Sequence, residues 1–312
     1  MLAYLRLFRI ANVFTVIADT TAAYLLVHQG IDSWPAFVLL LLAGCLIYTA
    51  GMVLNDLFDL EQDREERPER PLPSGAISLS SARALGFGFL VAGTGFAIAA
   101  GFVTESVGAF WWRPGALGIV LAAAVLLYDR GLKRTVLGPI AMGSCRTFNL
   151  LLAGSLVASE HWYDFRPALL AFAFGIGIYI AGITWFARTE AKESSSSSLA
   201  GATFVVVLGL VVFSLASFTD PIWQANLQAR SPWFWPGLVG LVGVSVVRRC
   251  INAINSPSPQ MVQLAVKVGI LALIVFDAAV CMFALPGELF YALFVLTLLA
   301  PSLWLGRWIR AT

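Results

Sequence analysis

The chain alternates long apolar runs with short polar loops, and the runs have the length of helices that cross a lipid bilayer. A spanning helix needs about 20 mostly apolar residues. Candidate spans cover residues 10–28, 35–57, 82–104, 112–128, 137–158, 167–187, 199–218, 233–250, 263–284 and 288–306. The pattern therefore predicts an all-α fold, a polytopic transmembrane helical bundle with as many as ten spans, forming a single domain over residues 1–312.

Composition supports a membrane protein and excludes several other classes. Hydrophobic residues make up 59% of the chain and charged residues 12%, about half the charged share of a soluble domain. This excludes a soluble protein of ordinary surface and an intrinsically disordered chain. A net charge of +2 is too small to indicate nucleic acid as a partner. The four cysteines have no zinc-ligand spacing and are expected to be buried thiols.

The distribution of basic residues predicts an orientation. With the N-terminus in the cytoplasm, 16 of the 20 Lys and Arg residues fall on the inner side, and only Arg113, Arg166 and Arg230 fall outside. This asymmetry favours an even number of spans with both ends in the cytoplasm. We expect a multi-pass integral protein of a bacterial-type inner (plasma) membrane, surrounded by membrane lipid.

The most polar segment follows the second predicted span and begins Asn-Asp-Leu-Phe-Asp. Asn55, Asp59 and Asp63 are spaced four residues apart, so a helix would carry them on one face. Oxygen atoms gathered there suit Mg²⁺, which commonly binds carboxylates together with substrate phosphates. A solvated helix end held by local ion pairs is the alternative, because arginines interleave with the acids.

Two features favour a functional site over that alternative. Asn55 and Asp59 lie against the apolar end of a span, where polar groups are costly. Pro68 should end the helix near Arg67, and the following Pro-rich run predicts a rigid turn aimed back at the acidic face.

The spacing of Asn55, Asp59 and Asp63, followed by Arg-Pro-Leu-Pro-Ser-Gly from Arg70 to Gly75, resembles the first signature of the UbiA superfamily of intramembrane prenyltransferases. Members of that family usually have nine spans, so nine to ten are expected here. The resemblance implies a bundle that binds a prenyl diphosphate through Mg²⁺ and passes the prenyl group to an acceptor. It implies that Asn55, Asp59 and Asp63 are metal ligands and that Arg67 and Arg70 face the diphosphate.

The second acidic motif of that family is degenerate in this chain. It should follow the sixth span, which here ends Ile-Thr-Trp-Phe-Ala-Arg-Thr-Glu, and Ile183 stands where the family has its first Asp. Glu190 and Glu193 take the remaining metal-ligand places, and Arg188 is a candidate for binding phosphate directly. The alternative is an ordinary charged helix end, and with one carboxylate lost a second Mg²⁺ would bind weakly or not at all.

A basic loop follows the fourth span, where the family often has a Tyr and a Lys four residues apart. Here the interval from Tyr128 to Lys133 is one residue longer. Lys133 and Arg134 are candidates for the diphosphate, and Lys133 joins Asp59 and Asp63 as a candidate catalytic residue. The alternative is the positive charge that any cytoplasmic loop carries.

Polar residues also occur inside the apolar runs, among them Asp19, Arg146, Asn149 and Asp277. A charge at the centre of a span costs about 2.5–3.5 kcal/mol on insertion scales, so such residues pair within the bundle. We predict an ion pair between Asp19 and Arg146, which could have only a structural role. The run around Arg146 and Asn149 resembles the EboC branch of UbiA-like proteins, which is tied to secondary-metabolite clusters.

These observations predict an Mg²⁺-dependent enzyme that transfers a prenyl group from a prenyl diphosphate to an unknown lipophilic or aromatic acceptor, with its site facing the cytoplasm. A non-catalytic or weakly catalytic protein that binds isoprenoid lipids or assists their transport is the alternative, favoured by the degenerate second motif. A lyase or cyclase that ionises the diphosphate without an acceptor is a third possibility.

Overall fold

A computed structural model describes residues 1–104, 110–157, 159–188, 194–226 and 231–308, and these residues contain helices and no strands. The long helices are α2 (Ile10–His28), α3 (Trp34–Phe58), α5 (Leu79–Ala100), α6 (Arg113–Arg130), α7 (Gly138–Ala153), α8 (Pro167–Ala187), α9 (Ser196–Ser214), α12 (Phe234–Asn255) and α13 (Pro259–Ala284). The last pass is α14 (Leu289–Thr297) with α15 (Leu299–Trp308). Short helices are α1 (Leu2–Leu7), α4 (Leu60–Glu66), η2 (Leu132–Arg134), α10 (Ala216–Thr219) and α11 (Pro221–Asn226).

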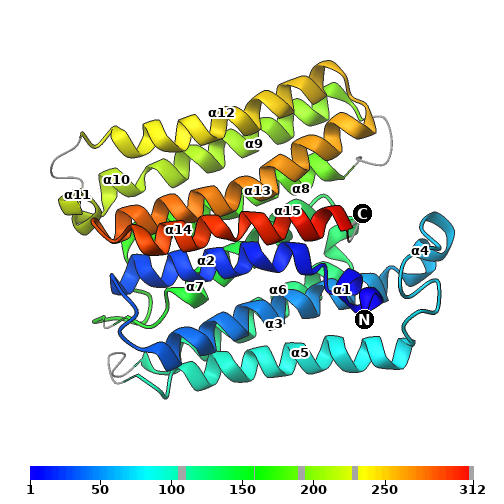
Figure 1. The fold of residues 1–312 in the computed structure, drawn as a ribbon, viewed down its shortest axis with the longest axis horizontal. Coiled ribbons are helices and arrows are strands. Elements are labelled where there is room, and N and C mark those ends of the chain that lie inside the picture. The colour runs from blue at the N-terminus through cyan, green and yellow to red at the C-terminus, as the bar shows by residue number, and fades with distance from the viewer. Residues whose placement is uncertain (105–109, 158, 189–193, 227–230, 309–312) are drawn as a thin grey trace.

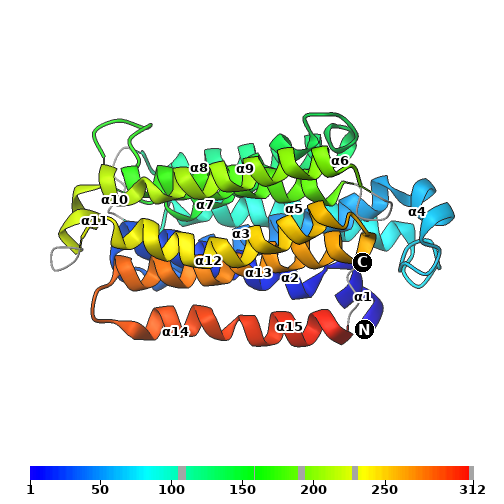
Figure 2. The ribbon, with the colours of Figure 1, turned by 90° about the horizontal axis from the view of Figure 1, so that it is seen from above.

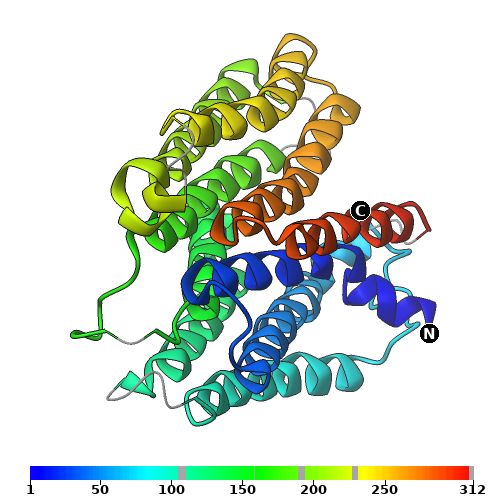
Figure 3. The same ribbon diagram turned by 60° about the vertical axis from the view of Figure 1, so that its left-hand side comes forward.

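The long helices run up and down along one common axis (Figure 1). Helices α3 and α5 lie on one side of α2, whereas α9 and α12 lie on the other (Figure 3). Helices α14 and α15 pass along the outside of α13 and α2 (Figure 2). The first residues and the end of α15 lie at the same end of the bundle as α4, as an even number of passes requires.

Eight of the described helices are long and apolar enough to cross a membrane, which corrects the expected nine to ten spans. The expected spans 112–128 and 137–158 are present as α6 and α7, of 18 and 16 residues. Helix α7 is shorter than the bilayer core requires, and α6 carries Arg113, Asp129 and Arg130 at its ends. The sequence therefore predicted both segments correctly as helices. However, α6 carries too much charge and α7 is too short to count as a membrane-crossing helix.

Small residues let the central helices approach closely. A side chain at Gly143 of α7 would collide with the Gly177 carbonyl of α8, and one at Gly209 of α9 would collide with the backbone at Tyr179. Contacts of this kind replace the hydrophobic driving force that is missing between helices in lipid. These contacts hold α7, α8 and α9 closely together.

The acidic segment lies where α3 passes into α4. Asp59 forms the junction, and backbone hydrogen bonds from Asp59 to Asn55 (3.0 Å) and from Asp63 to Asp59 (2.8 Å) continue the helical path across it. Helix α4 ends at Glu66, so the predicted stop before Pro68 is confirmed. A turn with Gly75 at φ 74° then leads to α5, whose N-terminus is capped by Ser78.

Candidate active site

Asp59 is held by two basic side chains from the loop after α6. The Lys133 ammonium donates to Asp59 Oδ2 at 2.7 Å, and the Arg134 guanidinium donates to Oδ1 at 3.1 Å. These residues lie more than 70 positions apart in the sequence, and the η2 helix brings them together. The structure therefore places both predicted diphosphate-binding residues on a predicted metal ligand.

Asn55 has a partner that the sequence did not identify. Its Nδ2 donates to Asp129 Oδ1 at 2.8 Å, and Asp129 is only 3% exposed. This bond directs the amide nitrogen away and leaves Oδ1 of Asn55 as the atom able to coordinate a cation. The only sequence signal for Asp129 is its position four residues before Lys133.

Asp63 is buried and bound to Arg70, whose Nη1 lies 2.8 and 3.0 Å from the two carboxylate oxygens. Burial raises the pKa of the Asp63 carboxyl, and Arg70 acts in the opposite direction. The Pro-rich loop thus turns back to the acidic face, as predicted, and Arg70, which the resemblance assigned to the diphosphate, here pairs with Asp63.

Asp56 continues this network toward the N-terminus. The Arg9 guanidinium donates to Asp56 Oδ1 at 3.1 Å, and Arg70 lies 3.6 Å from the same oxygen. Arg9 sits between α1 and α2 with a left-handed backbone at φ 45°. The sequence identifies Arg9 only as one of the basic residues that flank a span. Its contact with Asp56 is not visible there, because the two residues lie 47 positions apart.

Each of the three acids Asp56, Asp59 and Asp63 is therefore neutralised by a basic side chain. Among the described residues no group of three His, Cys, Asp or Glu side chains converges as a metal site. The donors are nonetheless oxygens, which Mg²⁺ prefers, and they sit on consecutive helical turns. The residues would thus fit a magnesium ion if the basic partners released the acids.

The remaining predicted site residues are distributed as follows. Arg188, at the end of α8, donates through Nη2 to the Thr135 carbonyl beside η2, so it joins Lys133 and Arg134 at this end of the bundle. Arg67 caps the end of α4. The metal-ligand candidates Glu190 and Glu193 lie outside the described residues.

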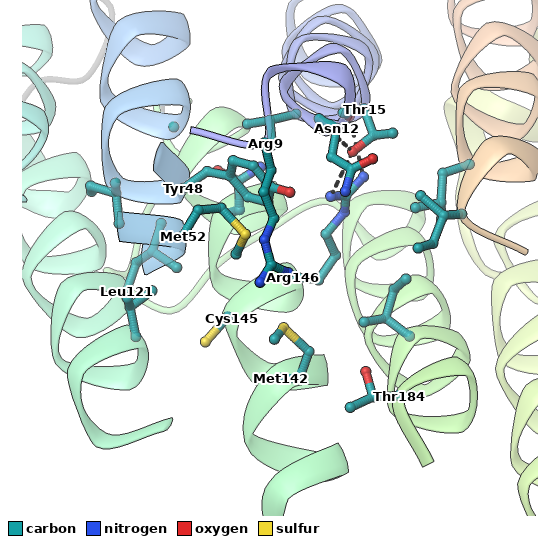
Figure 4. A pocket seen from close by; sticks show the side chains of 18 of the residues that line it. Arg9, Asn12, Thr15, Tyr48, Met52, Leu121, Met142, Cys145, Arg146 and Thr184 are labelled. Atoms are coloured by element: carbon teal, nitrogen blue, oxygen red, sulfur yellow. Dashed lines mark hydrogen bonds between the residues drawn. The ribbon is translucent and has the colours of Figure 1, made fainter. Parts of the chain in front are cut away.

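A cavity of about 220 Å³ opens between α2, α3, α6, α7, α8 and α13 (Figure 4). Tyr48 and Met52 of α3 line it, and Asn55 and Asp59 follow on the same face at intervals of three and four residues. Helix α8 contributes Ile183, the residue in place of the second motif's first acid. One face of α3 thus leads from the cavity to the acidic cluster.

The predicted ion pair between Asp19 and Arg146 is confirmed, since Arg146 Nε contacts Asp19 Oδ2. Arg146 also donates to the Thr15 hydroxyl and carbonyl, both at 3.2 Å, as the dashed lines in Figure 4 show. Asp277 of α13 lies beside Asp19, and both carboxyl groups are fully buried. Arg146 and Asn149 line the cavity from α7.

Comparisons with known sequences agree with this geometry. The profile of the UbiA prenyltransferase family matches residues 16–262. A digeranylgeranylglyceryl phosphate synthase of Methanoculleus marisnigri is 30% identical over 252 residues, which cover 78% of this chain and 82% of the relative. That of Sulfolobus acidocaldarius is 34% identical, covering 70% and 77%. Against that of Metallosphaera sedula, 27% identical, the chain spans 57% of the relative's length.

Solved structures share the fold at low sequence identity. A UbiA homologue from Archaeoglobus fulgidus bound to GPP and Mg²⁺ matches with a TM-score of 0.60 at 14% identity, covering 87% of this chain and 99% of that one. A digeranylgeranylglyceryl phosphate synthase matches with a TM-score of 0.59 at 18% identity, covering 96% and 97%. At such identities the likeness supports the fold alone.

Proposed function

We propose, because the chain belongs to the UbiA prenyltransferase family, that this integral membrane protein transfers a prenyl group from a prenyl diphosphate to an acceptor inside the bilayer. The observation that carries the proposal is the position of the acid–base cluster at one end of the cavity, on the face of α3 that also lines it. Oxygen ligands for a metal and basic residues for a diphosphate are thereby adjacent to an apolar chamber.

Asn55, Asp59 and Asp63 would hold Mg²⁺, which when bound neutralises charge on the departing diphosphate. The basic residues on the acids are the natural ligands for the phosphate oxygens. When the substrate binds, Lys133 and Arg134 can release Asp59 and bind the diphosphate instead. Arg188 lies next to them and can bind the same group. The carboxylate of Asp59, released from its basic partners, would then be able to hold Mg²⁺.

The chemical step needs a dry chamber. The C1–O bond of the prenyl diphosphate breaks, and its electron pair leaves with the diphosphate. The allylic carbon then bonds to the acceptor, which loses a proton. Apolar side chains from several helices, including Val125, Ile180 and Leu273, line the cavity and would keep water from capturing the cation.

The structure of the acceptor and the assignment to the EboC branch are also proposals. The matched relatives are named digeranylgeranylglyceryl phosphate synthases, so a glyceryl phosphate lipid belongs in any acceptor panel beside aromatic acceptors. The EboC-like resemblance around Arg146 and Asn149 stays a prediction. We also propose that the acidic end of the bundle faces the cytoplasm of a bacterial-type inner membrane.

A non-catalytic isoprenoid-binding role is the second candidate. It is favoured by Ile183, which is 3% exposed and presents an apolar side chain to the cavity where the family has an acid. Such a protein would bind prenyl diphosphate without releasing pyrophosphate.

The two functions are separated by incubating the purified protein with prenyl diphosphates of several lengths. We expect pyrophosphate release with Mg²⁺ and none with EDTA, and prenylated product when a suitable acceptor is present. Tight binding of every donor without pyrophosphate release would instead establish the binding role.

Replacing Lys133 by Met should change two affinities in opposite directions. Without substrate, Lys133 competes with the metal for Asp59 at 2.7 Å, so the variant should bind Mg²⁺ alone about tenfold more tightly, the worth of one charge-assisted hydrogen bond. With saturating Mg²⁺, its affinity for a prenyl diphosphate should fall by about the same factor.

Both affinities can be measured by calorimetry in detergent, with Mn²⁺ titration monitored by electron paramagnetic resonance as a second probe. Arg130→Met is the matched control, because Arg130 is an exposed cation at the end of α6. If Lys133→Met weakens both affinities, the proposed exchange is wrong.

A further inference from the structure

We infer that Arg146 and Asn149 of α7 form a subsite for an anionic oxygen group, a phosphate or carboxylate, on the acceptor. Both residues line the cavity, three positions apart, so they lie on one face of the helix. The assignment to the acceptor rests on the proposed function, whereas the anion site itself does not.

Asn149 supplies the first argument. It is only 6% exposed, and its Nδ2 has no hydrogen-bond partner among the described residues. A buried donor left unpaired is costly, and native proteins rarely keep one without a use. Because Asn149 borders the cavity, rotation of its side-chain amide would present this donor to a ligand there.

Arg146 supplies the second argument. Its Nη1 and Nη2 each donate to Thr15, and its Nε lies against Asp19 without a hydrogen bond, so one N–H on each Nη atom is left over. These contacts fix the guanidinium from the side of α2, at the wall of the cavity that Arg146 lines. A guanidinium fixed in this way is a preorganised binder of planar or tetrahedral oxyanions.

The positive charge of the side chains that line the cavity favours the binding of an anion. Among the described residues that line it, the charged side chains are Arg9 and Arg146, and no carboxylate belongs to the lining. The acids near them, Asp56, Asp19 and Asp277, do not belong to the described lining. A ligand inside the cavity therefore meets donors and positive charge.

Asn149 lies too far from the acidic cluster to contact the diphosphate of the donor. Asn149 Oδ1 packs against Gly44 of α3, and Asn55 lies 11 residues further along that helix, about 16 Å at the helical rise. An apolar prenyl tail, on the other hand, would leave the Arg146 and Asn149 donors unpaired. A second substrate with an anionic group can bind away from the acidic cluster and also accept hydrogen bonds from Arg146 and Asn149.

Binding of dodecyl phosphate in EDTA, without Mg²⁺ or prenyl diphosphate, tests the subsite directly. We expect saturable binding by calorimetry, no comparable binding of dodecanol, and about a tenfold loss in the nearly isosteric variant Asn149→Leu. Ser144→Ala is the matched α7 control, because Ser144 lines a separate pocket. A parallel titration with dodecanoate separates phosphate from carboxylate preference.

Thermal unfolding shows which variants are folded, and Asn149→Ala replaces Asn149→Leu if the latter does not fold. Unchanged affinity in a folded Asn149 variant, or equal binding of dodecanol, would overturn the subsite. Pyrophosphate release by the parent protein is scored separately. Release without an Asn149-dependent anion site sinks the inference alone, and an anion site without release sinks the proposed function alone.

Discussion

Replacing Asp59 by Asn is expected to lower Mg²⁺-dependent pyrophosphate release on the order of 100-fold or more. Asp59 is the acid that both Lys133 and Arg134 bind, so the proposed exchange of cations centres on it. A metal stabilises developing charge by several kcal/mol, and each 1.36 kcal/mol is a factor of ten in rate. The amide has nearly the same shape as the acid, so the effect should come from the lost charge.

Initial rates of pyrophosphate release across a Mg²⁺ titration measure this effect. Glu61→Gln is the matched control, because Glu61 lies two residues away, is largely exposed and pairs with the nearby Arg64. The control should keep the parent rate within a factor of about two, as an exposed ion pair contributes little. Equal rates for Asp59→Asn and the parent would show that the catalytic metal, if any, binds elsewhere.

The helices of this fold could be predicted from the sequence because lipid leaves the backbone no other partner. Inside a bilayer every N–H and C=O must be satisfied within the segment, so long apolar runs become helices. The same reasoning predicted the pair of Asp19 and Arg146, since a buried charge needs a counter-charge. It overestimated the spans at α6 and α7, where charge and length depart from the pattern.

The contacts of the acidic cluster were only partly predictable. The spacing of Asn55, Asp59 and Asp63 is local information, and so is the turn that returns Arg70. In contrast, the bonds from Arg9 to Asp56 and from Asn55 to Asp129 join residues 47 and 74 positions apart. Their geometry depends on how α2 and α6 pack against α3, which no local pattern specifies.

The same difference applies to the cavity. The sequence marked Arg146 and Asn149 as unusual residues inside an apolar run, but not the wall that they form together. That wall exists because close packing of α7 on α8 at Gly143 fixes the rotation of α7, so that Arg146 contacts α2 and Asn149 packs against α3. Single polar residues in a span are therefore visible in the sequence, whereas a subsite becomes visible only when helix rotation is known.

Replacing Arg146 by Met should destabilise the protein by about 3–5 kcal/mol, because it leaves the fully buried Asp19 without its counter-charge. In the double variant Asp19→Asn with Arg146→Met both charges are gone, and more than half of the loss should be recovered. The free energy of unfolding can be followed by denaturation in mixed micelles. Arg83→Met, at an exposed position of α5, is the control and should stay within about 0.5 kcal/mol of the parent. If the double variant is no more stable than Arg146→Met alone, Asp19 is not the group that Arg146 neutralises, and the cluster with Asp277 is held together by other contacts.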